Sequence, residues 1–110
     1  MQNDEYNSSK LVSKRPLVIR SLRRSNVRKK IADYLFDISP SGSYTSEIAY
    51  NVKTTPTNVL GAIRGMSSRY REEESLINLN IVELDETNQG IKIYRITDFG
   101  KEIINSLKEK

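Results

Sequence analysis

The stretch YTSEIAYNVKTTPTNVLGAIRGM, Tyr44 to Met66, decides the fold because it predicts two short helices joined by a few residues. The first helix is EIAYNV, with Thr45 or Ser46 as its N-cap. Its inward side is predicted to be Ile48, Ala49 and Val52. The second helix follows KTT, where Thr55 can act as the cap and Pro56 takes the first helical position, which suits its missing N–H. Two such helices form a helix-turn-helix pattern.

The second helix of this stretch contains two glycines, and an interior glycine costs roughly 1 kcal/mol relative to alanine. At 100° per residue the buried stripe of the helix is predicted to be Val59, Ile63, Met66 and Tyr70. The outward face is predicted to be Thr57, Gly61, Arg64 and Ser68, with Gly65 and Arg71 at its edges. We expect these small residues to let a DNA groove come close. The alternative is a small-residue pair that packs against a partner protein.

Upstream, another helix is predicted from Ser25 or Asn26, either of which can cap it, to Ile38, where SPSG ends it. Its apolar positions at helical spacing are Val27, Ile31, Leu35 and Ile38, with Tyr34 beside them. Residues 1–14 are polar without an apolar period, which is typical of disorder. LVIRSLRR, after Pro16, could be a short helix or an extended arm, and the sequence leaves both open.

Downstream, Leu76, Ile77, Leu79 and Ile81 are predicted to be core residues, and Asn80 is suited to a left-handed backbone conformation. Strands near 82–85 and 91–96, joined by the turn ETNQG, predict a β-hairpin. A last helix over 98–108, capped by Thr97, places four apolar residues on one side: Phe99, Ile103, Ile104 and Leu107. That side could serve the core or a dimer interface.

Composition excludes several function classes. The 110 residues suffice for one domain, and they include neither Cys nor His, which removes thiol and imidazole nucleophiles and the usual zinc sites. Phosphate-binding glycine loops and metal-binding motifs are also missing from the sequence. Its apolar runs are far shorter than the 18 or so residues that span a bilayer. We expect a cytoplasmic protein that is not an enzyme and that uses no metal or cofactor.

The net charge of +4 is unevenly distributed. Residues 1–30 carry nine Lys or Arg and two acids, whereas residues 72–90 carry six acids and no base. A basic front and an acidic rear would orient the molecule on a polyanion. The alternative is that the basic segment is only a solvated tail.

The order of these elements, together with YRITDFGKEII near the end of the chain, resembles winged helix-turn-helix transcription regulators. Tyr94, Arg95, Ile96, Thr97 and Gly100 match in order the family's passage from the wing into the last helix. The resemblance implies an α+β, mainly α, fold over residues 25–108, with residues 1–24 as a flexible basic arm. The segment from Tyr44 to Met66 is further similar to small archaeal regulators that activate motility (archaellum) genes.

The resemblance implies that the third helix is a recognition helix in the major groove of double-stranded DNA. The expected contacts to bases or nearby phosphates come from Thr55, Thr57, Asn58, Gly61, Arg64 and Ser68. Capping alone would also explain Thr55. Before the preceding helix, Tyr44, Thr45 and Ser46 are expected to meet a phosphate, with plain capping as the alternative.

The basic arm is expected to supply most of the affinity. Phosphate contacts are expected from Arg23, Arg24, Arg28 and Lys29, with Lys14, Arg15, Arg20 and Lys30 as further candidates. If five phosphates are neutralised, the slope of log affinity against log salt is about −4 to −5. The wing tip offers Asn88 and Gln89, with Lys92 flanking them. Because Asp85 and Glu86 repel phosphate, we expect either a weak contact of the wing with DNA or a minor-groove contact through Asn88 and Gln89.

Two functions from different classes remain open at this point. The first is a sequence-specific DNA-binding regulator, acting as a homodimer through the last helix or the arm, or as two monomers on a repeat. The second is a winged-helix adaptor of transcription or replication machinery, whose glycine face docks a helix and whose acidic Glu72–Glu74 run contacts a basic partner. RNA binding is a third option. A basic arm on the same side as the recognition helix favours DNA, and the opposite side favours the adaptor.

Overall fold

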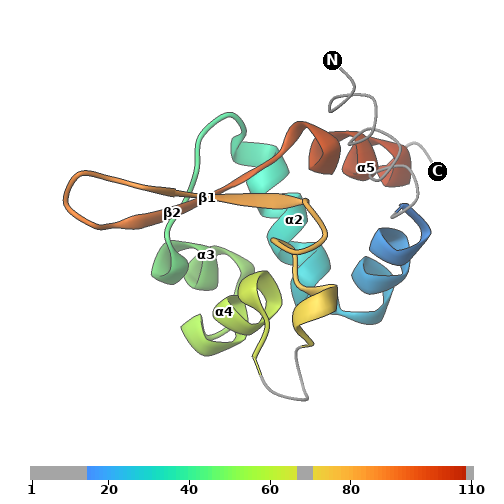
Figure 1. Cartoon of the computed structure of the whole chain (residues 1–110), viewed down its shortest axis with the longest axis horizontal. Helices are drawn as coiled ribbons and strands as arrows, with labels where there is room; N and C mark the ends of the chain where they lie inside the picture. The colour runs from blue at the N-terminus through green and yellow to red at the C-terminus, as the bar shows by residue number, and fades with distance from the viewer. Residues whose placement is uncertain (1–14, 67–70, 109–110) are drawn as a thin grey trace.

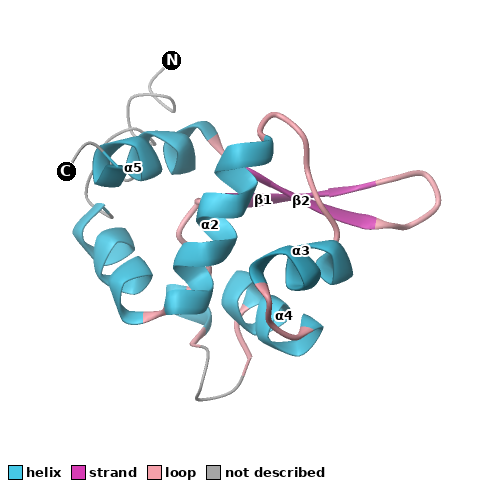
Figure 2. Ribbon diagram, turned by 180° about the vertical axis from the view of Figure 1, so that it is seen from behind, coloured by secondary structure: helices cyan, strands magenta, loops and turns pink. Residues whose placement is uncertain are grey.

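The chain is built around one central helix. The computed structural model describes residues 15–66 and 71–108. Helix α2 (Asn26–Ile38) lies in the middle of the molecule, with the helical residues 15–24 on one side (Figures 1 and 2). On its other side lie α3 (Thr45–Val52) and α4 (Pro56–Arg64). The remaining elements, in chain order, are the short 3-10 helix η1 (Glu72–Glu74), strand β1 (Val82–Glu86), strand β2 (Lys92–Ile96) and helix α5 (Asp98–Lys108).

Capping groups place the helix boundaries close to where the sequence predicts them. The Ser25 hydroxyl accepts a hydrogen bond from the Arg28 N–H at 3.1 Å, so Ser25 is the cap of α2. The Thr97 hydroxyl likewise accepts from the Gly100 N–H at 2.9 Å and starts α5. Helix α3 differs from the prediction. Its N-cap position is Tyr44, which makes no side-chain capping bond, so Thr45 and Ser46 are not the caps.

The hairpin is antiparallel and is anchored at its base. In its register Leu84 lies opposite Tyr94, and Val82 opposite Ile96. Tyr94 also exchanges two backbone hydrogen bonds, of 2.8 and 2.9 Å, with Ser43 in the loop before α3. The base of the hairpin is therefore bonded on two sides, while the hairpin itself projects away from the helices (Figure 1).

The core lies between α2 and the elements around it. Its largest fully buried side chains include Ile31, Leu35, Ile48, Ile63, Leu76, Leu79, Ile81, Tyr94, Ile103 and Ile104. Of the predicted core residues of 76–81 and α2, Leu76, Leu79, Ile81, Ile31 and Leu35 are confirmed as buried. The others, Ile77, Val27, Tyr34 and Ile38, are only partly buried against the core. The apolar side of α5 packs on this core, since Ile103 and Ile104 are buried and Phe99 and Leu107 lie against them.

The basic segment before α2 departs from the expected flexible arm. Residues 15–24 are helical, and Val18 and Leu22 are 0% and 1% exposed within the common core. The expected domain boundary at residue 25 is therefore wrong for this helix, because its apolar side is needed to cover α2 and η1. The part of the expected arm before residue 15, with Lys14, lies outside the described residues.

Three central helices, a two-stranded antiparallel hairpin and a closing helix make a winged helix-turn-helix fold, as the sequence predicts. The hairpin is the wing, and α3 and α4 are the helix-turn-helix. Within residues 15–66 and 71–108, the helices are too short or too polar to cross a membrane.

Candidate nucleic-acid interface

Helix α4 begins with an exposed first turn. Thr55 is its cap, since the hydroxyl accepts from the Asn58 N–H at 3.1 Å, and Pro56 occupies the first helical position. Thr55, Pro56 and Thr57 are all exposed. Asn58 is half-buried, and its side-chain amide donates to the Thr54 hydroxyl at 3.0 Å, so it lies back along the helix start. Thr55 thus has a structural role, and Thr57 is the outward side chain of this turn.

The two glycines do not form the expected outward face. Gly61 is buried, together with Val59, Ala62 and Ile63. Gly65 is not inside the helix at all, because α4 ends at Arg64. Its φ of +89° requires glycine, and a Cβ there would lie 2.5 Å from the Glu72 Cα. Packing and chain reversal therefore account for both glycines.

The helix end also changes the predicted buried stripe. Val59 and Ile63 are fully buried as predicted, but Met66 lies beyond the helix and is 43% exposed. Tyr70 and Ser68 lie outside the described residues. The carbonyls at the end of α4 accept from the returning chain, with Leu76 N–H bonded to Ala62 O and Ile77 N–H to Ile63 O, both at 3.0 Å.

The exposed surface of α4 is a strip that includes an apolar residue. Thr57 and Arg64 are seven residues apart, so they lie within about 20° of each other around the helix. Leu60 lies between them along the chain, about 40° from Arg64 around the helix, and is half-buried. We call Thr57, Leu60 and Arg64 the outer strip of α4. A hydroxyl, an apolar group and a guanidinium are three groups that base edges in the major groove can engage, the apolar one at a thymine methyl.

The N-terminus of α3 lies next in the chain to a polar loop. Tyr44 and Ser46 are exposed and Thr45 is half-buried, and the Ser43 hydroxyl donates to the Glu47 carboxylate at 2.6 Å. No side chain caps this end of α3, so its first backbone N–H groups receive no side-chain capping bond. Glu47 in the first turn adds a negative charge there, which weakens a phosphate contact.

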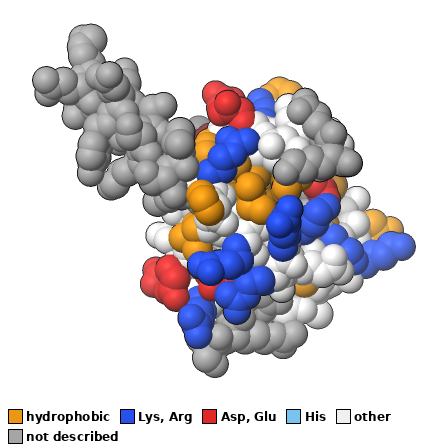
Figure 3. Space-filling view, turned by 90° about the vertical axis from the view of Figure 1, so that its right-hand side faces the viewer, with side chains coloured by type: hydrophobic (Ala, Val, Ile, Leu, Met, Phe, Trp, Pro, Cys, Tyr) orange, Lys and Arg blue, Asp and Glu red, His pale blue; other side chains and the backbone are white. Residues whose placement is uncertain are grey.

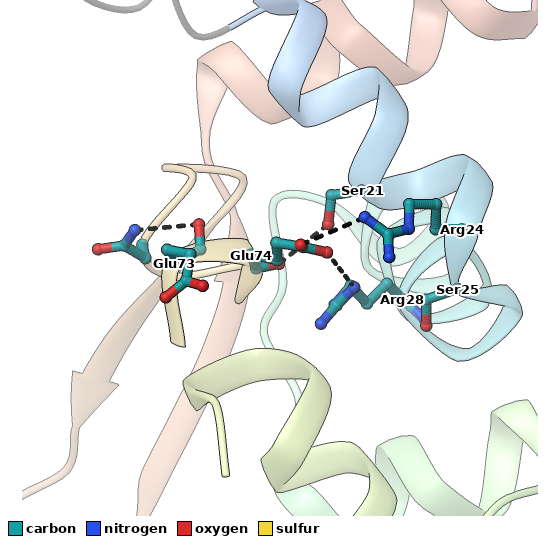
Figure 4. A network of polar contacts seen from close by, with 7 residues as sticks. Ser21, Arg24, Ser25, Arg28, Glu73 and Glu74 are labelled. Carbon is teal, nitrogen blue, oxygen red and sulfur yellow. Dashed lines mark hydrogen bonds and ion pairs between the residues drawn. The ribbon is translucent and has the colours of Figure 1, made fainter. Parts of the chain in front are cut away.

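The expected phosphate-binding arginines of residues 23–28 are partly committed to an internal network (Figure 4). Glu74 of η1 pairs with Arg28 at 3.4 Å and with Arg24 at 3.6 Å, and its backbone carbonyl accepts from the Ser21 hydroxyl at 2.9 Å. The Arg28 side chain is only 6% exposed. The expectation that Arg28 contacts phosphate is therefore wrong, because this arginine joins α2 to η1 within the protein.

The other expected backbone contacts remain at the surface. Arg23 and Arg24 are exposed on the helical residues 15–24, and Lys29 is exposed on α2, paired with Asp33 at 3.1 Å. Both views of the fold place residues 15–24 across α2 from α4 and from the wing (Figures 1 and 2). The basic helix therefore does not lie on the recognition-helix side, which is the arrangement that favours the adaptor function.

The wing is acidic along one strand. Arg95 pairs with Asp85 and, at 3.9 Å, with Glu83, and β1 also carries the exposed Glu86. At the tip, Asn88 and Gln89 are exposed, and Lys92 follows at the start of β2. The tip groups expected to contact DNA are therefore at the surface, beside carboxylates that limit a phosphate contact.

Sequence comparison assigns the chain to a family. A sequence model described as EarA-like matches residues 18–107. The chain belongs to the EarA-like family. A protein of Methanocaldococcus jannaschii described as uncharacterized, MJ0905, is 47% identical over 95 residues, which cover 86% of this chain and 85% of that protein. The EarA-like match begins inside the helical residues 15–24, in agreement with the burial of Val18 and Leu22.

A solved structure supports the fold. The EarA-like chain is similar to MepR in the crystal structure of the S. aureus MepR–DNA complex, with a TM-score of 0.64 and 14% sequence identity. The alignment covers 99% of this chain and 82% of that chain. This likeness establishes the winged-helix architecture of the EarA-like chain.

Two residues of the EarA-like chain near α4 were not predicted from the sequence. Leu60 is half-buried next to Thr57 and Arg64, while Gly61 and Ala62 are buried. Lys53 is exposed at the end of α3, with φ +60°, shortly before the start of α4. The position of Lys53 in the turn of the helix-turn-helix pattern could have indicated it. The inward Val59 and Ile63 and the outward Thr57 and Arg64 of α4 are as predicted, and Gly61 is the residue that was assigned to the wrong side.

Proposed function

We propose that this EarA-like chain is a sequence-specific, double-stranded DNA-binding transcription regulator that places the outer strip of α4 in the major groove. The observation that carries the proposal is the strip itself. Helix α4 buries Val59, Ala62 and Ile63 in the core, while its exposed first turn and Arg64 face solvent. The resemblance of Tyr44–Met66 to archaeal motility-gene regulators supports a finer proposal, control of motility genes in the cytoplasm of an archaeon.

Each group of the strip has a proposed role. Thr57 hydrogen-bonds a base edge or phosphate near the helix start, Leu60 packs on a thymine methyl, and Arg64 binds guanine or a phosphate. Lys53, the N-terminus of α3 and Lys92 supply backbone contacts. Asp85 and Glu86 on the wing repel phosphate, and the arginines of residues 15–24 are remote from α4, so neither adds many phosphate contacts. We therefore expect about three neutralised phosphates and a slope of log affinity against log salt near −3.

Binding is proposed to be modest for one copy and specific for two copies on spaced half-sites. The apolar side of α5 is part of the core, so a dimer would have to use other surfaces of the described chain. The adaptor alternative loses its glycine face, because Gly61 is buried and Gly65 ends the helix. Of its acidic run, Glu74 is paired internally, while Glu72 and Glu73 remain exposed. The position of the basic helix also favours partner binding.

The experiment that tests the proposal selects a preferred duplex from a random pool. The affinity for that duplex and for a scrambled one is then measured by fluorescence anisotropy between about 50 and about 300 mM salt. We expect Arg64→Ala to lower the affinity for the selected duplex by roughly ten- to a hundredfold and to reduce the preference over the scrambled one. Arg20→Ala is the matched control, since it removes one exposed arginine far from α4.

Two outcomes would contradict the proposal. Failure to bind any duplex at the lowest salt would exclude DNA as the ligand. An equal loss of affinity for Arg64→Ala and Arg20→Ala, without change in sequence preference, would show that only net charge matters and that α4 does not recognise bases.

A further inference from the structure

The helical residues 15–24 present a basic face that is turned away from the core. The residues lining one shallow hollow on this face are Arg15, Pro16, Ile19, Arg20, Arg23 and Arg24. The side turned to the core consists of Val18, Ser21 and Leu22, all essentially buried. We call the hollow-lining set the basic face. Figure 3 shows Lys and Arg side chains gathered around an apolar patch on this side of the molecule.

Helix stability explains part of the arginine concentration on this face. Arg23 and Arg24 lie in the last turn of the helix, where the helix dipole favours cations. Arg20 lies outside that turn and is three and four residues from these like charges, which disfavours the helix by a few tenths of a kcal/mol per pair. Glu74 pairs with Arg24 at 3.6 Å, yet that arginine's side chain remains 60% exposed. Arg20 and Arg23 are also exposed. Residues 15–24 themselves contain no acid.

The centre of the face is apolar. Pro16 is exposed and Ile19 is half-buried, and at 100° per residue they lie between the arginines on one side of the helix. A phosphate backbone would use the guanidinium groups and leave these two side chains without a partner. An acidic protein segment with an apolar side chain would use both, because carboxylates form bidentate pairs with arginine while the apolar group packs on Ile19 and Pro16.

The face is also separated from the proposed DNA contact. Helix α2 lies between residues 15–24 and α4 (Figures 1 and 2), in a molecule whose extents are 37 × 34 × 29 Å. A duplex held by the outer strip of α4 therefore leaves the basic face open. The Glu74 network fixes this helix to η1 and α2, so the face is presented by a rigid part of the fold.

We propose that the basic face docks an acidic protein segment that carries an apolar anchor residue, with Arg20 and Arg23 pairing its carboxylates and Ile19 contacting the anchor. A promoter-bound chain would thereby hold a protein of the transcription machinery on the side away from the DNA. The docking itself does not depend on DNA binding, so the two proposals can fail separately.

The test uses the full chain and short fluorescent peptides of Asp, Glu and Leu in which the spacing of Leu is varied, measured by anisotropy without DNA. A poly-Glu peptide of equal length and a mixed-sequence duplex serve as comparison ligands. The variants are Arg20→Gln/Arg23→Gln and Ile19→Ser. The matched control is Lys30→Gln/Arg71→Gln, which removes two exposed charges elsewhere. Circular dichroism checks that each variant is folded.

We expect at least one Leu-containing peptide to bind. Its affinity should fall about tenfold in Arg20→Gln/Arg23→Gln and about fivefold in Ile19→Ser, and should stay within about twofold in the control variant. Failure of every peptide to bind overturns the proposal. If poly-Glu binds as tightly as the Leu-containing peptides and Ile19→Ser has no effect, the part of the proposal that assigns an apolar anchor to Ile19 is overturned. A duplex whose affinity falls tenfold on Arg20→Gln/Arg23→Gln, with peptides unaffected, would instead assign the face to nucleic acid.

Discussion

Gly65 shows how one residue can determine the end of a recognition helix. Its backbone, at φ +89° and ψ +143°, lies in a region that only glycine adopts readily. We predict that Gly65→Ala lowers the free energy of unfolding by about 2–3 kcal/mol, since strain adds to a collision with Glu72. Urea denaturation measures this. Gly90→Ala is the control: its φ is also positive, but its Cβ would meet only Glu86 Oε2 at 3.9 Å. Equal losses in the two variants would contradict the prediction.

Thr97 belongs to the motif that first suggested the wing, and its role is structural. Its hydroxyl accepts from the Gly100 N–H and donates to the backbone carbonyls of Asn80 and Ile81. We predict that Thr97→Ala lowers stability by about 1–2 kcal/mol, because both the cap and the link to β1 are lost. Thr97→Ser keeps the hydroxyl and should recover most of that loss in thermal unfolding. An unstable serine variant would mean that the methyl group, not the hydroxyl, matters.

At the scale of elements, the sequence predicted most boundaries but missed the end of α4, the start of α3 and the helix over residues 15–24. Helices α2 and α5 and the hairpin were predicted because caps, apolar spacing and turn residues agree in each. The end of α4 was missed because Met66 and Tyr70 continue the helical period past Gly65, so the glycine was interpreted as interior. Gly61, which the helical spacing placed on the outward face, is also buried.

The Glu74 network was not predictable from sequence, because its partners are separated by 46 residues. It joins three elements: residues 15–24, α2 and η1. We predict that Glu74→Ala costs about 2–4 kcal/mol of stability, because Arg28 is left buried without its carboxylate. Arg24→Ala should cost less than about 1 kcal/mol, since that pair is largely exposed. Equal costs in denaturant titrations would show that burial of Arg28 is not the deciding factor.

At the scale of the whole molecule, the basic N-terminal helix is part of the fold. We predict that deletion of residues 1–24 abolishes cooperative thermal unfolding or lowers the midpoint strongly. Val18 and Leu22 leave the core, and each buried side chain contributes about 1.5–3 kcal/mol. Deletion of residues 1–14 removes no core residue of the described structure and is the matched control. A stable, cooperative protein lacking residues 1–24 would show that this helix is dispensable.

The position of Tyr94 between Ser43 and Leu84 has a mechanical consequence for the wing. Ser43 and Leu84 hold its strand from opposite edges, so the hairpin is clamped at its root to the loop that leads into α3. Residues 86–92 lie farther out along the hairpin than this clamp. A load applied at the tip of the wing is therefore carried through the two Ser43–Tyr94 hydrogen bonds to the loop before the first turn of α3.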